Sequence, residues 1–140
     1  MPPATAAQAD SAAPGVADHG IVLFAHGARA ASWAQPFERL REIVAADHRD
    51  GPVRLAYLEL MTPDLPAVIE EMVAGGVARI DLFPIFLAVG SHLREDLPAL
   101  VETARARHPH LHIRVHPALG ESEAMLRVIA TGVAQSLASD

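Results

Sequence analysis

Short apolar segments alternate along this chain with segments of helical periodicity, and this alternation constrains the fold more than any other feature. The first apolar run, residues 20–25 (GIVLFA), is continuous and rich in branched side chains, which is typical of a strand buried on both faces. Three more strands are predicted within residues 53–60, 78–87 and 111–116. Each predicted strand is followed by a stretch with apolar residues at helical spacing, and the last stretch runs from 121 to 137.

This order predicts an α/β fold, in which four βα units form a parallel sheet with right-handed crossovers and helices on both faces. A small internal repeat supports this interpretation. The tetrapeptide DLPA occurs at residues 64–67 and again at 96–99, about one βα unit apart. Because proline is tolerated only in the first turn of a helix, the repeat predicts two equivalent helix starts.

Length and composition bound the class of protein. A chain of 140 residues is expected to form one domain, and 51% apolar against 20% charged residues predicts a globular protein. The Ala- and Pro-rich segment 1–18 is predicted to be a disordered tail, which leaves the domain at 19–140. No apolar run reaches the roughly 18 residues of a membrane span. The tail also lacks the basic start and apolar stretch of a secretory signal, so the cytoplasm is the expected location.

Cysteine is absent, and its absence restricts the chemistry. Disulfides, thiolate metal sites and cysteine nucleophiles are excluded, so a metal ion would be held by imidazole, carboxylate or water. The formal charge of −6 argues against a nucleic-acid-binding surface. An acidic ligand would therefore need a local basic patch.

Polar residues stand at the ends of three predicted strands. His26 follows the first strand, Glu59 ends the second, and His92 follows the third after a glycine-containing turn. Ligands of open parallel sheets bind beyond the carboxyl ends of the strands, so we expect these side chains to share one rim. Two imidazoles and a carboxylate suit a borderline divalent ion such as cobalt, iron, nickel or zinc.

Each candidate residue also has a structural explanation. His26 can cap a turn, and His92 can cap the third helix. Glu59 lies between apolar neighbours in a strand expected to be central, where a buried carboxylate is costly unless paired. A functional role and a partly exposed position at the strand end are equally compatible with this pattern. Arg29 and Arg94 follow the two histidines closely and can bind the carboxylates of an acidic ligand. Solvated surface arginines are the alternative.

Four more histidines lie close together near the C-terminus: His108, His110, His112 and His116. The alternation of residues 111–116 predicts an edge strand, with apolar side chains on one face and histidines on a solvated face. A metal-delivery surface is the alternative hypothesis.

Several segments match the motifs of one family. Residues 24–29 (FAHGAR) resemble the HGSR-type motif of the CbiX/SirB sirohydrochlorin chelatase family, and residues 57–63 (YLELMTP) resemble its LE-x-x-x-P segment. Residues 84–92 (PIFLAVGSH) resemble its P-x-F-L-x-x-G-x-H segment, and residues 96–98 match the D-[IL]-P that follows. Residues 119–120 (LG) give a shorter match.

The resemblance spans about residues 20–136 and implies both a fold and a function. Family members insert Co²⁺ or Fe²⁺, and archaeal relatives Ni²⁺, into sirohydrochlorin, a tetrapyrrole rich in carboxylates. The resemblance implies that His26 and His92 are the metal ligands. It also implies that a chain of this length forms a homodimer resembling the two-repeat long members. Ala28 stands where serine is common in the family.

The expected mechanism follows from that resemblance. The two motif histidines hold the divalent ion, itself a substrate, above the ring, and Glu59 or one of the histidines accepts the N–H protons. Arg29, Ser91 and Arg94 are the candidate substrate-binding residues. Cobalt for cobalamin is the first expected metal and iron for siroheme the second, and no organic cofactor is expected.

Rival functions fit the sequence less well. A histidine phosphatase also places a histidine after its first strand, but it uses an Arg-His-Gly run, and Ala25 precedes His26 here. Residues 90–92 (GSH) do not form the G-x-S-x-G elbow of a serine hydrolase. A non-enzymatic metal-binding or tetrapyrrole-carrier protein would use the same ligands and stays open.

Overall fold

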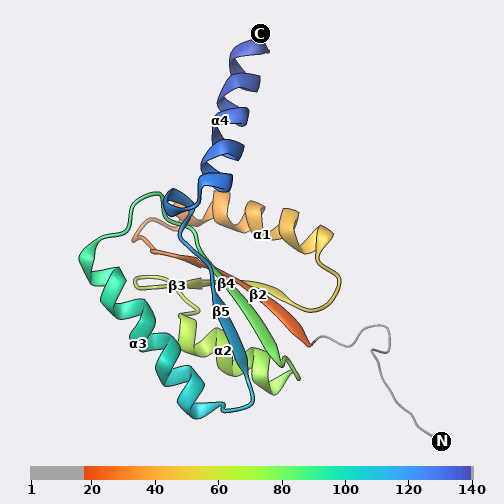
Figure 1. Cartoon of the computed structure of the whole chain (residues 1–140), viewed down its shortest axis with the longest axis vertical. Helices are drawn as coiled ribbons and strands as arrows, with labels where there is room; N and C mark the ends of the chain where they lie inside the picture. The colour runs from red at the N-terminus through yellow and green to blue at the C-terminus, as the bar shows by residue number, and fades with distance from the viewer. Residues whose placement is uncertain (1–17, 140) are drawn as a thin grey trace, which may run out of the picture.

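A parallel sheet of four strands forms the centre of the computed structural model, which describes residues 18–139 (Figure 1). In chain order the strands are β2 (His19–Ala25), β3 (Val53–Tyr57), β4 (Arg79–Pro84) and β5 (His112–Val115). They lie side by side in the order β3-β2-β4-β5, so β2 and β4 are central and β3 and β5 are edges. The predicted α/β fold is confirmed. The predicted tail, residues 1–18, lies outside the described residues except for Asp18.

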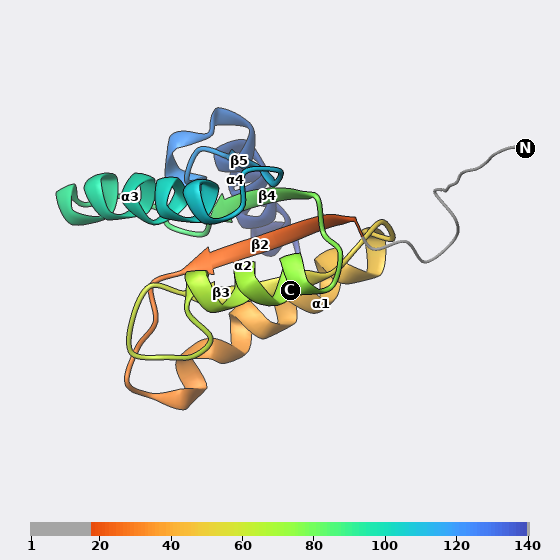
Figure 2. The ribbon, with the colours of Figure 1, turned by 90° about the horizontal axis from the view of Figure 1, so that it is seen from below.

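A helix follows each strand, as the alternation predicts. The helices are α1 (Gln35–Asp47), α2 (Leu65–Ala74), α3 (Ser91–Arg107) and α4 (Glu123–Ala138), with short 3-10 turns η1 (Ala31–Ala34) and η2 (Leu119–Glu121) before α1 and α4. One face of the sheet packs on α1, and the opposite face packs on α2 and α3. Figure 2 shows α1 and α3 on opposite sides of β2. Among residues 18–139, no helix has the length and apolar character that a membrane crossing requires.

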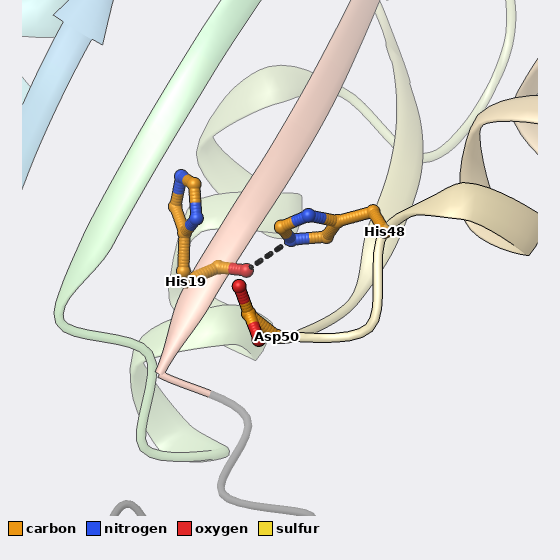
Figure 3. Close-up of side chains that lie close together, drawn as sticks. All are labelled: His19, His48 and Asp50. Carbon is orange, nitrogen blue, oxygen red and sulfur yellow. Dashed lines mark hydrogen bonds between the residues drawn. The ribbon is translucent and has the colours of Figure 1, made fainter.

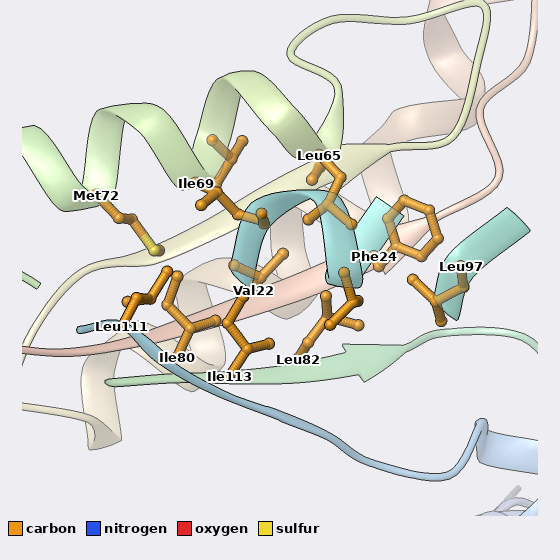
Figure 4. Close-up of a cluster of buried hydrophobic side chains, with 14 of the residues drawn as sticks. Val22, Phe24, Leu65, Ile69, Met72, Ile80, Leu82, Leu97, Leu111 and Ile113 are labelled. Carbon is orange, nitrogen blue, oxygen red and sulfur yellow. The ribbon is translucent and has the colours of Figure 1, made fainter. Parts of the chain in front are cut away.

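The central strand β2 contributes to two hydrophobic clusters, one on each face of the sheet. Val22 and Phe24 are fully buried against α2 and α3 (Figure 4), whereas Leu23 and Ala25 pack on the face that α1 covers. Burial of apolar surface, at about 25 cal/mol per Å², is the main stabilising term in such a core. Burial on both faces explains the continuous apolar run of β2 and places the residue after it, His26, at the carboxyl edge of the sheet.

The two DLPA segments do not mark equivalent helix starts, so this prediction is wrong for the second copy. Asp64 is the N-cap of α2, where its side chain accepts a hydrogen bond from the Ala67 N–H at 3.0 Å. Pro98, in contrast, lies inside α3, which already begins at Ser91. Buried Leu93 extends the apolar face of α3 one turn further toward its start. The proline sits on the exposed side of the helix, where water can reach the carbonyl that it leaves without a partner.

The last helix does not pack on its own sheet. The predicted arrangement, with helices packed on both faces of the sheet, requires the apolar side of α4, at Met125, Val128, Ile129 and Val133, to face inward. In the structure α4 projects away from the sheet (Figure 1), and none of its residues is buried. Val133 is 58% exposed. The predicted apolar side exists, but within one chain nothing covers it.

A carboxylate on β4 joins the two neighbouring strands. Asp81 accepts hydrogen bonds from His19 Nε2 at 2.5 Å and from His116 Nε2 at 2.7 Å. Burial raises the pKa of Asp81, but the hydrogen bonds from His116 and His19 outweigh it and hold that pKa below its ordinary value of 3.8. Asp81 is therefore ionised at neutral pH and links β2, β4 and the end of β5 on one face of the sheet.

Replacing Asp81 with alanine is expected to lower the free energy of unfolding by about 1–3 kcal/mol, because two partly buried imidazole N–H groups lose their acceptor. Urea unfolding followed by circular dichroism measures the change. Glu95→Ala, which removes an exposed carboxylate from α3, is the matched control. Equal unfolding midpoints for the two variants would contradict this role of Asp81.

Candidate functional site

The three predicted site residues follow three adjacent strands. His26 comes directly after β2, and Glu59 comes two residues after the end of β3. His92 is the second residue of α3, which follows β4 after a short loop. Since β3, β2 and β4 are neighbours in a parallel sheet, all three residues belong to its carboxyl edge.

His26 and Glu59 lie close together at this edge. His26 Nδ1 is 4.0 Å from Glu59 Oε2, and both side chains are about half exposed, at 52% and 55%. The ring of His26 meets the ring of Phe86 edge-to-face, with 6.2 Å between centroids. Its Nδ1 also lies 3.3 Å from the carbonyl oxygen of Gly27, a local turn contact. The pair thus offers an imidazole and a carboxylate to solvent side by side.

The structure corrects the expected surroundings of Glu59. The sequence predicted a central strand that runs to residue 60, but β3 is an edge strand that ends at Tyr57. Leu60 then turns the chain with a left-handed φ of 67°. The Glu59 carboxylate is therefore exposed, and the cost of burying a charge does not argue for its function. Its short distance to His26 is the observation that does.

Backbone contacts fix the distance between the two segments. Leu58 N–H donates to Ala25 O at 2.9 Å, and Glu59 N–H donates to His26 O at 3.1 Å. Gly27 has a positive φ of 95°, and a Cβ built on it would lie 1.8 Å from the Glu59 carbonyl oxygen. Only glycine allows this close approach, so the residue after His26 sets how near Glu59 can come.

Gly27→Ala is expected to lower the free energy of unfolding by about 1–3 kcal/mol or more. The added methyl group would collide with the backbone of Glu59, and alanine rarely adopts the left-handed conformation of this residue. Thermal unfolding measures the loss. Gly90→Ala is the control, because its φ is −79° and no atom lies within 4 Å of an added Cβ. A Gly27→Ala protein as stable as this control would show that the corner tolerates a side chain.

His92 lies on the same edge as the other two candidates, at the start of α3. It is exposed in the first turn of α3, and the N-cap position of that helix is Gly90, so His92 is not the capping residue. Within residues 18–139, no hydrogen bond or ion pair joins His92 to His26 or Glu59. The loop before α3 is anchored at its start, where Ile85 N–H donates to Phe24 O at 2.8 Å.

The three predicted substrate-binding residues are all exposed near this edge. Arg29 lies in the loop after His26, and Ser91 is the first residue of α3. Arg94 Nη2 donates to Glu121 Oε2 at 2.8 Å, so its guanidinium already has a carboxylate partner from η2. The sequence did not predict Glu121 as a partner, although the short motif at residues 119–120 stands beside it.

The four C-terminal histidines do not converge. β5 is an edge strand, as predicted, and His112 is exposed on it. His108 Nε2 bonds Glu70 Oε2 at 2.6 Å, whereas His116 bonds Asp81 and stacks on Phe83 with 4.0 Å between ring centroids. His108 and His116 thus serve separate structural contacts, and the structure gives no support to a metal-delivery surface.

Comparison with protein families identifies the chain. The family model described as CbiX matches residues 20–136, which is nearly all of the described structure. The chain belongs to the CbiX family. The motifs around His26, Glu59 and His92 all fall within the matched range.

Curated relatives of this CbiX-family chain include proteins named sirohydrochlorin cobaltochelatase. The proteins of Methanothermobacter thermautotrophicus and Methanosarcina barkeri are each 30% identical to it over 82 residues. These matches cover 59% of this chain and 57% and 63% of the two relatives. The chain thus aligns with less than two thirds of the length of either relative.

Solved structures share the fold. The crystal structure of a cobalamin (vitamin B12) biosynthesis CbiX protein from Marinobacter aquaeolei VT8 is 34% identical, with a TM-score of 0.73 over 85% of this chain and 97% of that one. SirB of Bacillus subtilis subspecies spizizenii, in complex with cobalt, is 24% identical, with a TM-score of 0.69. That match covers 84% of this chain but 50% of SirB, so the CbiX-family chain corresponds in fold to one half of SirB.

Proposed function

We propose that this CbiX-family chain is a sirohydrochlorin chelatase, an enzyme that inserts a divalent metal ion into a tetrapyrrole. Co²⁺ is the first candidate for this ion. The observation that carries the proposal is the placement of two imidazoles and a carboxylate after three adjacent strands of the sheet. Their exposure leaves coordination positions open for a flat macrocycle. The names of the curated relatives and the cobalt complex of SirB support this substrate and this metal.

Metal insertion requires two functions, ion binding and proton acceptance, and different residues provide them. Each divalent ion that enters the ring releases two N–H protons, so the site must bind the ion and accept protons. We assign ion binding to the neutral imidazoles of His26 and His92. Glu59 is the proton acceptor, since its Oε2 lies 4.0 Å from His26 Nδ1 at the same exposed edge.

Substrate carboxylates need positive or hydrogen-bonding groups at this edge. We assign this role to Arg29, Ser91 and Arg94, which are exposed in the loops and first helical turn around the two histidines. Arg94 is held by Glu121 at 2.8 Å. Binding a substrate carboxylate at Arg94 therefore requires exchange of one carboxylate for another, which an exposed ion pair permits at low cost.

The proposal includes a homodimer in which α4 packs on a second copy of the chain. Every side chain of α4 is exposed in the single chain, and residues 128–138 contain no charge. An apolar cavity of about 470 Å³ lies beside the base of this helix, with Ile21, Val44 and Phe83 among its walls. An uncovered apolar helix beside an uncovered apolar cavity indicates a missing partner.

A second copy is the partner that fits both surfaces. In a symmetric exchange, α4 of each copy covers the open face of the other, so one contact buries both apolar features. The alignment with half of SirB supports the same conclusion, because two copies would match the length of that chain. The homodimer and a cytoplasmic location both stay predictions, checked by sedimentation equilibrium and by cell fractionation.

The test of the proposed function is the absorbance spectrum of sirohydrochlorin mixed with Co²⁺ in the presence and absence of the protein. We expect the protein to raise the initial rate of insertion well above the free-solution rate. Parallel reactions with Fe²⁺ and Ni²⁺ rank the metals, and Fe²⁺ is the second candidate because SirB of Bacillus subtilis is also known with Fe³⁺. A spectrum that shows binding without faster insertion, with all three metals, would identify a carrier instead.

A further inference from the structure

A second group of metal-ligand side chains lies at the opposite end of the sheet from the proposed active site. His19 begins β2, His48 directly follows α1, and Asp50 lies in the turn that leads to β3 (Figure 3). One ligand atom from each of the three side chains lies within 4.8 Å of the others. His19 begins the seven-residue strand β2 and His26 directly follows its end, so the two lie about 20 Å apart at the rise of an extended strand.

Both histidines already hold one ring nitrogen in a hydrogen bond. His19 Nε2 donates to Asp81 Oδ2 at 2.5 Å, where Asp81 is ionised and can only accept. His48 Nε2 donates to the His19 carbonyl oxygen at 2.8 Å (Figure 3), because a carbonyl can only accept. These bonds fix the Nε2–H tautomer of both rings and leave both Nδ1 lone pairs for another partner. Metal-binding histidines in proteins show this arrangement, in which the second nitrogen donates to a carboxylate or a carbonyl.

The hydrogen bond from His48 Nε2 to the His19 carbonyl oxygen also has a structural explanation, but that explanation does not involve Nδ1. His19 N–H donates to Asp50 O and Ile21 N–H donates to Pro52 O, so the His19 carbonyl faces Pro52 in the ladder. Pro52 has no N–H to donate, and His48 Nε2–H takes its place. Neither Nδ1 of His48 nor the carboxylate of Asp50 is needed for this replacement hydrogen bond.

The turn before β3 brings the third ligand into place. A Cβ built on Gly51 would lie 2.1 Å from the His19 carbonyl oxygen, so only glycine lets this turn lie against the start of β2. The neighbouring Asp50 is thereby held beside His19, and its side chain is exposed to solvent. Two imidazoles and one carboxylate form the donor set of many sites for borderline divalent ions, whereas calcium and magnesium prefer oxygen donors alone.

We propose that His19, His48 and Asp50 form a second divalent-cation site, for an ion such as Zn²⁺, Co²⁺ or Ni²⁺, that fastens the turn after α1 to the start of β2. Water fills the remaining coordination positions. The site shares no ligand with the proposed substrate-metal site. Its ion stays bound, whereas the ion at His26 and His92 is transferred to the tetrapyrrole in each reaction cycle. Binding to the folded state alone stabilises the protein in proportion to the free ion concentration.

Calorimetric titration of the full chain with Zn²⁺ tests the proposal independently of the chelatase activity. The parent protein carries His26→Ala and His92→Ala, so the substrate-metal site is absent from it. We expect this parent to bind one equivalent of Zn²⁺, and its melting temperature to rise with Zn²⁺ concentration. Adding His48→Gln, which keeps an N–H for the His19 carbonyl, or Asp50→Asn, which keeps the shape of an exposed side chain, is expected to remove both effects.

The control is His110→Gln, which replaces an exposed histidine outside the group. This variant of the parent should still bind one equivalent of Zn²⁺, and Zn²⁺ should still raise its melting temperature. A parent that binds no Zn²⁺ would overturn the proposal. So would an Asp50→Asn protein that binds Zn²⁺ as the parent does. Circular dichroism of each variant confirms the fold, and Asp50→Asn keeps the test decisive if a histidine variant fails to fold.

Discussion

Replacing His26 with alanine is expected to lower the rate of Co²⁺ insertion at least about 100-fold, while the protein keeps its fold. Loss of a residue that merely orients a metal ligand already costs about 10–100-fold in affinity or activity, and loss of a ligand costs at least as much. His26 is 52% exposed and its side chain makes no buried polar contact, so its removal leaves the core intact. The initial rate of the sirohydrochlorin absorbance change measures the effect.

A companion variant separates a metal ligand from a general loss of activity. His92→Ala is expected to show a loss of similar size, although His92 lies in the first turn of α3 and, within residues 18–139, no hydrogen bond or ion pair joins it to His26. His110→Ala removes an exposed histidine elsewhere and should retain the wild-type rate. Full activity in His26→Ala would exclude His26 as a ligand and would remove the main residue of the proposed site.

Placing a charge on the apolar side of α4 is expected to convert the dimer into a monomer. Ile129 is 42% exposed in the single chain and lines the apolar cavity beside the sheet. In the proposed dimer Ile129→Asp buries an unpaired carboxylate, which costs several kcal/mol in each copy and outweighs what the contact gains. Sedimentation equilibrium over a range of protein concentrations measures the change of mass.

A charge on the other side of the same helix provides the control. Ala134 lies, by helical spacing, on the side of α4 opposite the apolar cavity, so Ala134→Asp adds the same charge to the same helix. That variant should stay dimeric. If wild-type protein is a monomer at all concentrations, or if both variants stay dimeric, α4 does not form the contact.

The central part of the fold follows from local sequence patterns because its side chains are buried within one chain. The unbroken apolar run of β2 predicts burial on both faces, and the alternation in β5 predicts an edge strand. α4 could not be placed in the same way. Its apolar spacing shows that one side must be covered, but periodicity does not say whether its own sheet or another molecule covers it.

Two other differences between the predicted and the observed structure have causes that the sequence does not display. Pro98 was expected in a first helical turn, but buried Leu93 begins the apolar face of α3 earlier, and an exposed proline is tolerated within it. Glu59 was expected in a central strand, but strand order is set by contacts between distant segments. β3 lies at the edge and ends at Tyr57, so Glu59 is exposed.

The candidate site was largely predictable because one rule of parallel sheets brings its parts together. His26, Glu59 and His92 are far apart in sequence, yet each follows a strand, and parallel strands end at the same edge. No such rule predicts the contact between His19 and Asp81, which lie 62 residues apart and are brought together by the register of the two central strands. The group around His19 therefore becomes visible only in three dimensions.

The most direct test of the central claim is a turnover count with sirohydrochlorin and Co²⁺ in large molar excess over the protein. A chelatase releases its product and starts again, so the metallated product should grow linearly to many equivalents per chain. Product formation that stops at one equivalent per site, or that then continues only at the free-solution rate, would show that the protein binds these molecules without catalysing insertion.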